Sequence, residues 1–354
     1  MKPDFSRYKG VIRETFQEGN RNLQTKAFSG ANEPRAIGAL NRQGAPKRKL
    51  TLSDPITDHE FFDSLHELTG ITGKEPKYHE APGLHPDFAA IKETGELEYH
   101  WIVSMFIDIR RSTRLFAKYK DPYVVANITT TIQRAAIHIA WYFDAYIQRY
   151  HGDGLMIYFG GKGVQSREAI SNALLAASVF TKFVKEELPD IFLEQGVEDI
   201  YTRIGVDVGE NDETLWHLAG MQDCSEVTTC SLHTSLAAHM QCMAEPNGVI
   251  VGDNVKNWSG LDAGLFNIRK DAKGVEDRYC FTVPEEKYYY TQWNFEWAEH
   301  LKRVEATAGD GPGAVVKKAV TAGIPASTGP AASGGLNLPY LRQQASAIKP
   351  YSEL

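Results

Sequence analysis

The pattern of apolar and polar residues predicts that an ordered core begins near Tyr99. The segment YHWIVSMFIDI is mostly apolar and rich in strand-forming residues, and the basic pair Arg110 and Arg111 follows it. Such a run is typical of a buried central strand that ends at a site. From about Ser112 to Tyr142, apolar residues recur at three- and four-residue steps. This spacing predicts a long helix that packs one face on a sheet.

Two short strand-like runs, DAYIQRY and LMIYFGG, flank the tetrapeptide His-Gly-Asp-Gly and predict a β-hairpin with Asp153 at its tip. Further helical patterns span about 166–187 and 231–244. The remaining strand-like runs are YTRIGVDVG, WHLAG, GVIVGD and RYCFTV. The order β-α-β-β-α-β, with additions, predicts a ferredoxin-like α+β fold with helices on one face of a mostly antiparallel sheet.

The flanks of this core have other patterns. Residues 1–97 are polar and mixed, which predicts an arm of unknown role with one short amphipathic helix, TDHEFFDSLHELTGI. Residues 285–306 are aromatic, and their period predicts a helix docked on the core or on a partner. Residues 307–354 are rich in Gly, Ala and Pro and predict a tail that cannot fold alone. We therefore place the core domain at 98–284.

Composition and charge narrow the partners. With 354 residues, of which 42% are apolar, the chain can fill a large core. Its formal net charge of -7 provides no basic field for a nucleic-acid backbone and favours a small anionic substrate held by local cations. The four cysteines fit neither a zinc site nor a disulfide scaffold, and no apolar run is long enough for a membrane span. We therefore expect a cytoplasmic protein without a nucleic-acid or membrane partner.

Two carboxylates end neighbouring predicted strands, Asp108 after the buried strand and Asp153 at the hairpin tip. Hard divalent ions prefer oxygen ligands, and a two-metal phosphoryl-transfer site needs such a pair. Each residue alone also fits a turn or helix N-cap. Their joint occurrence favours metal binding.

The segments FIDIRRST and HGDGLMIYFG resemble the class III adenylate and guanylate cyclase domain. In that family the first strand ends in a metal-binding Asp followed by Ser or Thr, and a later hairpin carries a second metal-binding Asp after Gly. The resemblance covers roughly 99–283. It implies two divalent ions, Mn²⁺ or Mg²⁺, bridged by Asp108 and Asp153, with the Ile109 carbonyl as a further ligand. It also implies closure of a nucleoside triphosphate into a 3′,5′-cyclic monophosphate, with release of pyrophosphate, in a head-to-tail homodimer with two composite sites.

Other family positions fall on less typical residues. RIGVDVG resembles the family's Arg-Ile-Gly strand, and KGVEDRYCF resembles its closing strand, where a Lys contacts the phosphates. The resemblance gives this role to Lys273, with Lys270 as the less favoured alternative. The transition-state Asn and Arg fall on Ser235 and His239, four residues apart and hence on one helix face. It stays open whether Ser235 and His239 act in catalysis or only line the helix.

The base-reading positions also depart from the purine pattern. Arg149 stands where adenylate cyclases usually have Lys, and the second base-reading position falls near Thr228, with Glu226 as a neighbour. These departures resemble the pyrimidine cyclases of bacterial antiphage defence, the Pycsar systems, which make cyclic UMP or cyclic CMP as an infection signal for a separate effector.

A pyrimidine reader needs bulk and hydrogen-bond donors. Arg149 and Tyr150 are candidate donors to the carbonyls of uracil, and Phe106 is a candidate for bulk, although a core Phe is the simpler interpretation. Because cytosine has an exocyclic amine that prefers an acceptor, an Arg favours uracil. We therefore expect a uridylate cyclase acting on UTP. The alternatives are a cytidylate cyclase, a purine cyclase, and a catalytically inactive nucleotide-binding module, against which the retention of both carboxylates argues.

Overall fold

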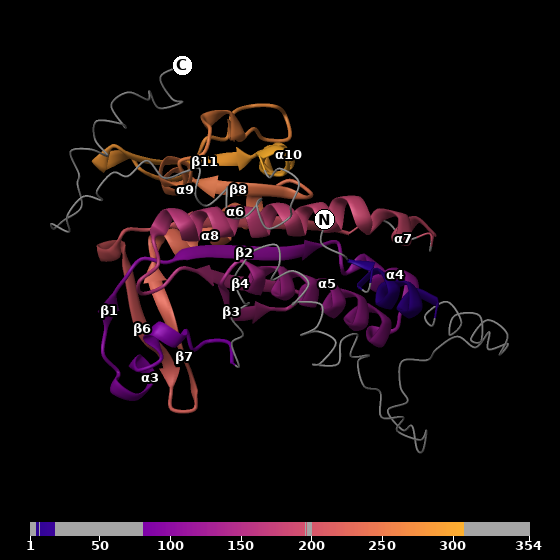
Figure 1. The fold of residues 1–354 in the computed structure, drawn as a ribbon, viewed down its shortest axis with the longest axis horizontal. Coiled ribbons are helices and arrows are strands. Elements are labelled where there is room, and N and C mark those ends of the chain that lie inside the picture. The colour runs from indigo at the N-terminus through magenta and orange to yellow at the C-terminus, as the bar shows by residue number, and fades with distance from the viewer. Residues whose placement is uncertain (1–4, 7, 18–80, 195, 197–199, 308–354) are drawn as a thin grey trace.

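The computed structural model describes residues 5, 6, 8–17, 81–194, 196 and 200–307 (Figure 1). The amphipathic helix predicted within residues 1–97 and the predicted C-terminal tail lie outside these residues. Within them, the chain forms a large sheet flanked by helices and a second, small sheet that projects from it.

The large sheet has the strand order β10-β11-β8-β5-β2-β4-β3, and β9 pairs with β11. Its neighbouring strands are antiparallel except for the parallel pair of β5 and β8. The strands are β2 (Val103–Arg110), β3 (Ala145–His151), β4 (Gly154–Phe159), β5 (Tyr201–Val208), β8 (Gly248–Gly252), β9 (Phe266–Ile268), β10 (Tyr279–Val283) and β11 (Tyr288–Phe295). The predicted strand before Arg110 is thus β2, and it lies between β4 and β5 in the middle of the sheet.

The longer helices are α5 (Pro122–Tyr142), α6 (Ser166–Lys182), α8 (Leu232–Met243) and α10 (Trp297–Thr307), and the short helix α4 (Arg114–Tyr119) precedes α5. The other short ones are η1 (Pro86–Phe88), α3 (Ile91–Thr94), the π-helix η2 (Phe183–Glu187), α7 (Pro189–Glu194), η3 (Asn211–Glu213), α9 (Asp253–Ser259), η4 (Ala263–Leu265) and η5 (Pro284–Glu286). Helix α5 begins where Asp121 accepts a hydrogen bond from the Tyr123 amide, with Pro122 at the first helical position. Both features are common at helix N-termini.

The two faces of β2 pack against different helices. Val103, Met105 and Ile107 belong to the main core, which includes the apolar faces of α5 and α6. On the opposite face, the Ser104 hydroxyl lies 2.8 Å from that of Thr234 in α8. The predicted ferredoxin-like α+β fold is confirmed. The structure adds that α8 covers the other face, because a central strand with inward residues on both sides requires cover on both.

The small sheet has the order β1-β6-β7 and forms an arm beside the main sheet (Figure 1). Its strands are β1 (Glu98–Tyr99), β6 (Thr214–Met221) and β7 (Cys224–Ser231). Phe88 stacks on Trp216 with ring centroids 3.9 Å apart, and both join a second apolar cluster with Met156 and Tyr158 of β4. This cluster fixes the arm against β3 and β4.

The C-terminal aromatic segment differs from its prediction. Tyr288–Phe295 is strand β11, so the prediction of a helix from 285 onward is wrong for this half. Every second side chain can reach the core from a strand, and Tyr290 is buried there. The helix begins only at Trp297. An unpredicted helix near the N-terminus, residues 8–17, packs Tyr8, Ile12 and Phe16 into the main core.

Candidate active site

The structure brings the two predicted metal carboxylates to neighbouring places at one end of the sheet. Asp108 lies near the end of β2, and Asp153 lies at the tip of the β3–β4 hairpin, after Gly152 with a φ of 59°. A Cβ on Gly154 would lie 2.5 Å from the Ile107 carbonyl and 3.5 Å from the Asp108 Cα. Only glycine therefore lets the hairpin pass this close to β2. The predicted hairpin is confirmed, and its tip lies beside the end of the central strand.

The carboxylate of Asp153 has an unused buried oxygen. Its Oδ2 atom is buried and has no hydrogen-bond partner among the described residues. A buried polar atom of this kind is costly unless a ligand satisfies it. The described part of the chain holds no group of three or more His, Cys, Asp and Glu side chains that could bind a metal. Two carboxylates that leave other positions to water and phosphate oxygens are typical of Mg²⁺ sites, so the donor set fits a divalent ion.

Arg203 is a site residue without a distinct signal in the sequence. It lies opposite Asp108 on β5, and its Nη2 atom donates to Asp108 Oδ2. Its Nη1 atom donates to the Cys242 carbonyl near the end of α8, at 2.9 Å. The RIG triplet that resembles the family strand contains this residue, but only the strand register shows that it faces Asp108. The guanidinium thus holds the Asp108 carboxylate and ties it to α8.

The predicted base-reading residues divide between the two faces of the sheet. Phe106 and Arg149 both pair with Met156, from either side, so they share a face. Tyr150 pairs with Leu155, and its charged neighbour is Arg134 of α5. It therefore lies on the face that α5 covers, opposite to the face that carries Phe106 and Arg149. That Tyr150 reads the base stays a prediction.

A β-bulge is the reason for this division. The register of β3 against β4 shifts between Ile147 and Arg149, which leaves Gln148 as the extra residue. The shift turns Arg149 and His151 toward Phe106, and the His151 ring stacks on the Phe106 ring at 5.5 Å. Without the bulge, Gln148 and Tyr150 would occupy this face.

Thr228 and Glu226 lie on β7, beside this face. Thr228 is buried and hydrogen-bonds to Tyr158, whose pKa is raised because the effect of burial outweighs that of its bonds to Thr229 and Thr228. Glu226 forms an ion pair with Arg149, with Oε2 3.1 Å from Nε. Arg149 is thus positioned by a carboxylate, while the Thr228 hydroxyl is engaged by Tyr158 of β4.

Ser235, His239 and Lys273 are not brought to the carboxylates within one chain. Ser235 and His239 are exposed on the outer side of α8, and the Ser235 hydroxyl donates to the Ser231 carbonyl at 3.1 Å. Lys273 lies in the exposed loop between β9 and β10. In the described ranges, none of the three is hydrogen-bonded to Asp108 or Asp153. The Ile109 carbonyl stays a predicted ligand.

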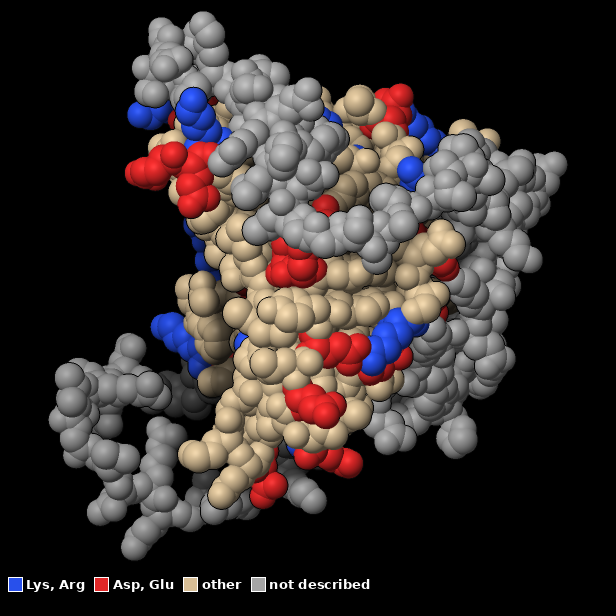
Figure 2. Space-filling view, turned by 90° about the vertical axis from the view of Figure 1, so that its left-hand side faces the viewer, with Lys and Arg blue, Asp and Glu red and all other residues tan. Residues whose placement is uncertain are grey.

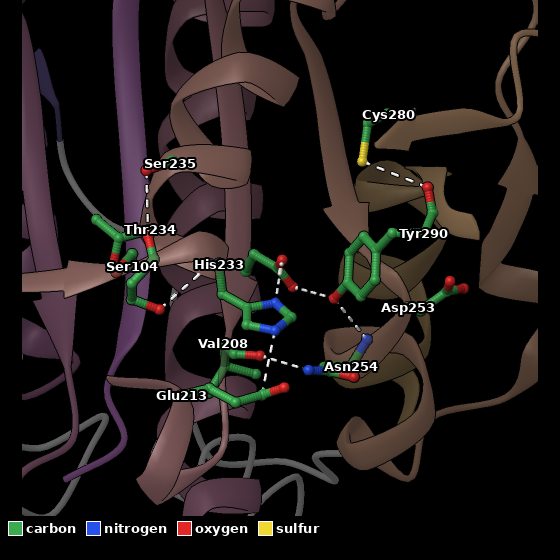
Figure 3. Close-up of polar contacts among 12 residues, drawn as sticks. Ser104, Val208, Glu213, His233, Thr234, Ser235, Asp253, Asn254, Cys280 and Tyr290 are labelled. Atoms are coloured by element: carbon green, nitrogen blue, oxygen red, sulfur yellow. Dashed lines mark hydrogen bonds and ion pairs between the residues drawn. The ribbon is translucent and has the colours of Figure 1, made fainter. Parts of the chain in front are cut away.

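A buried charged cluster lies on the same side of the sheet and was also missed (Figure 3). His233 of α8 lies between two carboxylates, with Nδ1 2.9 Å from Asp207 Oδ2 and Nε2 3.2 Å from Glu213 Oε2. Tyr290 donates to the other Asp207 oxygen at 2.8 Å. Burial alone would lower the pKa of His233, but Asp207 and Glu213 raise it to about 10. The imidazolium is therefore a fixed positive charge that anchors the start of α8 to β5.

Three curated proteins are similar to this chain. A cytidylate cyclase of Staphylococcus aureus is 32% identical over 263 residues, which make up 73% of this chain and 61% of that protein. Two cytidylate cyclases of Escherichia coli are 29% and 32% identical over 230 and 259 residues. These matches cover 64% and 71% of this chain and 49% and 56% of those proteins. The predicted resemblance to the pyrimidine cyclases is confirmed.

The chain spans about half to three fifths of the length of these cytidylate cyclases. No family model matches it. Among solved structures, the adenylyl cyclase CyaB from P. aeruginosa overlaps with a TM-score of 0.47 at 16% identity, over 56% of this chain and 95% of that one. The guanylyl cyclase Cya2 overlaps with a TM-score of 0.43 at 13% identity, over 57% and 93%.

Two observations concern the predictions that the protein has neither a nucleic-acid nor a membrane partner. On the face shown in Figure 2, the described Lys and Arg side chains lie in small groups interspersed with acidic ones. In the described ranges, no helix combines the length and the apolar character that crossing a bilayer requires.

Proposed function

We propose that this chain is a nucleotidyl cyclase that converts CTP into 3′,5′-cyclic CMP and pyrophosphate. The observation that carries the proposal is a pair of carboxylates, Asp108 on β2 and Asp153 at the adjacent hairpin tip, in a chain similar to three cytidylate cyclases. Cytosine is preferred over the uracil expected from the sequence, because every curated relative is named a cytidylate cyclase.

Asp108 and Asp153 would hold two divalent ions, Mn²⁺ or Mg²⁺, with the unpaired Asp153 Oδ2 as one donor. When bound, such ions lower the pKa of the ribose 3′-hydroxyl and neutralise the triphosphate. Arg203 fixes the Asp108 carboxylate from the side of β5. A guanidinium in this place also offers donors to phosphate oxygens. Positioning and charge neutralisation supply most of the barrier reduction in phosphoryl transfer, so no protein base is assigned.

The site is proposed to be completed by a second copy of the chain. Ser235 and His239 are exposed on α8, four residues apart, and Lys273 is exposed on its loop. In a symmetric head-to-tail dimer these side chains would approach the phosphates held by the partner's carboxylates. This arrangement gives a role to Ser235, His239 and Lys273, which make no hydrogen bond to Asp108 or Asp153 of their own chain in the described ranges.

The test is a substrate panel. Purified protein with Mn²⁺ is incubated with ATP, GTP, CTP and UTP, and the products are separated by chromatography. Cyclic CMP should dominate, and Asp153→Asn should lower turnover at least roughly 10³-fold, because a metal site contributes several kcal/mol to the barrier. A Glu98→Gln variant, which alters an ion pair with Lys162 on the surface of the arm, is the matched control and should stay active. If no triphosphate yields a cyclic product, the proposal is wrong.

A further inference from the structure

The face of the sheet that carries Asp108 has a carboxylate end and a guanidinium end. Phe106 and Asp108 are two residues apart on β2 and therefore share this face. Arg149 joins it through the common pairing with Met156. Apolar side chains, the Phe106 ring and Met156, lie between the two ends.

Arg149 does not act alone at its end. Its Nε and Nη2 atoms are both engaged by Glu226, so the ion pair is bidentate. Such fork-like pairs have a fixed geometry. The backbone beside Glu226 is also fixed, because the Val227 amide donates to the Gly83 carbonyl at 2.8 Å, and a Cβ on Gly83 would lie 3.1 Å from the Glu226 Cβ.

The pair keeps hydrogen-bonding capacity on its open side. The Arg149 and Glu226 side chains are 41% and 27% exposed. Arg149 Nη1 has no hydrogen bond to a described residue, and each carboxylate oxygen of Glu226 can accept a further bond. The pair therefore presents a donor and an acceptor side by side.

A donor next to an acceptor is the complement of one pyrimidine edge. Cytosine offers an exocyclic N4 amine, which donates, beside N3 and O2, which accept; uracil offers O4, an acceptor, in place of the amine. A carboxylate accepts well from the cytosine N4 amine and opposes the uracil O4. On the basis of the proposed function, we infer that Glu226 selects cytosine over uracil by accepting from the N4 amine, while Arg149, held by the same carboxylate, donates to N3 or O2.

This role revises the expectation that Arg149 makes the site prefer uracil. A guanidinium that is a lone donor is better matched by the uracil carbonyls. With Glu226 bound to it, the guanidinium is one half of the reader. The other half is the acceptor that the amine of cytosine requires.

The test is competition between CTP and UTP at equal concentration in one reaction, with the ratio of cyclic CMP to cyclic UMP as the readout. This ratio does not depend on the fraction of folded enzyme. In Glu226→Gln the amide can donate to O4, so the ratio should fall roughly tenfold to hundredfold, the discrimination that a good base contact supplies. Glu226→Asp should retain a preference for CTP. Glu98→Gln should keep the wild-type ratio.

The outcomes separate this inference from the proposed function. A wild-type enzyme that prefers CTP, together with an unchanged ratio in Glu226→Gln, would overturn the inference and leave the proposed function intact. A wild-type enzyme without any cyclic product would overturn the proposed function itself. If the turnover of Glu226→Gln is too low to measure a ratio, the dissociation constants of CTP and UTP with Ca²⁺ decide. Equal weakening of both would contradict a role in base selection.

Discussion

Arg203 and Asp207 lie four residues apart on β5, so both side chains project from the face that α8 covers. Arg203 pairs with Asp108, and the two side chains are 19% and 28% exposed. Asp207 pairs with His233, and these side chains are 0% and 3% exposed. We call Arg203–Asp108 the open pair and Asp207–His233 the closed pair. Both pairs involve residues of the same strand, β5.

The closed pair is satisfied from several sides. Asp207 accepts from His233 and Tyr290, and the Tyr290 hydroxyl in turn accepts from the Asn254 amide at 3.1 Å (Figure 3). The open pair lies beside Asp153, which keeps a buried oxygen without a partner. A charge that is fully partnered inside the protein serves the fold, and one that is left incomplete is available to a ligand.

The largest expected effect is a difference between variants of the two pairs: a change in the closed pair should lower stability, and a change in the open pair should lower activity. His233→Gln leaves Asp207 and Glu213 without their cation, so the free energy of unfolding should fall by about 3–5 kcal/mol. Arg203→Gln removes a partly exposed pair and should cost about 1 kcal/mol or less. On the proposed function, Arg203→Gln should nevertheless lower cyclase turnover by roughly 10²-fold, because Asp108 loses its anchor.

Urea unfolding and the CTP assay, run on both variants, check this separation. Asp207 and Asp108 would be serving the same purpose if the two variants lost similar stability. A His233→Gln variant of wild-type stability would show that the buried imidazole is not an ion-pair partner.

The sequence predicted the parts of the site that depend on local chemistry. The Gly-Asp-Gly turn and the apolar run before Asp108 suffice to place both carboxylates at the ends of neighbouring strands. The Arg203–Asp108 and Asp207–His233 pairs could not be predicted, because each joins residues from distant segments through the strand register and the placement of α8. The faces of Arg149 and Tyr150 depend on a bulge at Gln148, which has no signal in the residue types around it.

A second expected effect concerns pH. The pKa of His233 is raised from 6.5 to about 10 in the folded chain, since Asp207 and Glu213 outweigh the effect of burial. The folded state therefore binds more protons than the unfolded state between these two values. The stability that His233 contributes is fully present below pH 6.5 and is lost as the pH rises toward 10, by up to about 1.4 kcal/mol per pH unit.

This slope is measured as a difference, because other groups titrate in the same range. Urea unfolding at several values between pH 6.5 and 9.5 should give a wild-type free energy that falls more steeply than that of His233→Gln. Parallel profiles would mean that His233 does not hold an extra proton in the folded state. Arg203→Gln keeps His233 and both of its carboxylate partners, so its pH profile should stay parallel to that of the wild type.

The smallest expected effect tests how completely the closed pair is satisfied. Tyr290→Phe removes the hydroxyl that donates to Asp207 and leaves the Asn254 amide without its acceptor, with little change in volume. A hydrogen bond to a buried charge contributes about 1.5–3 kcal/mol, so the urea midpoint should fall while the m-value is kept.

Tyr289 is the matched control, because it is the adjacent half-buried tyrosine on β11 and its hydroxyl makes no hydrogen bond to a described residue. Tyr289→Phe should stay within about 0.5 kcal/mol of the wild type. Equal losses of unfolding free energy in Tyr290→Phe and Tyr289→Phe would mean that the Tyr290 hydroxyl does not help to hold Asp207. The closed pair would then differ from the open pair in burial but not in the number of its partners.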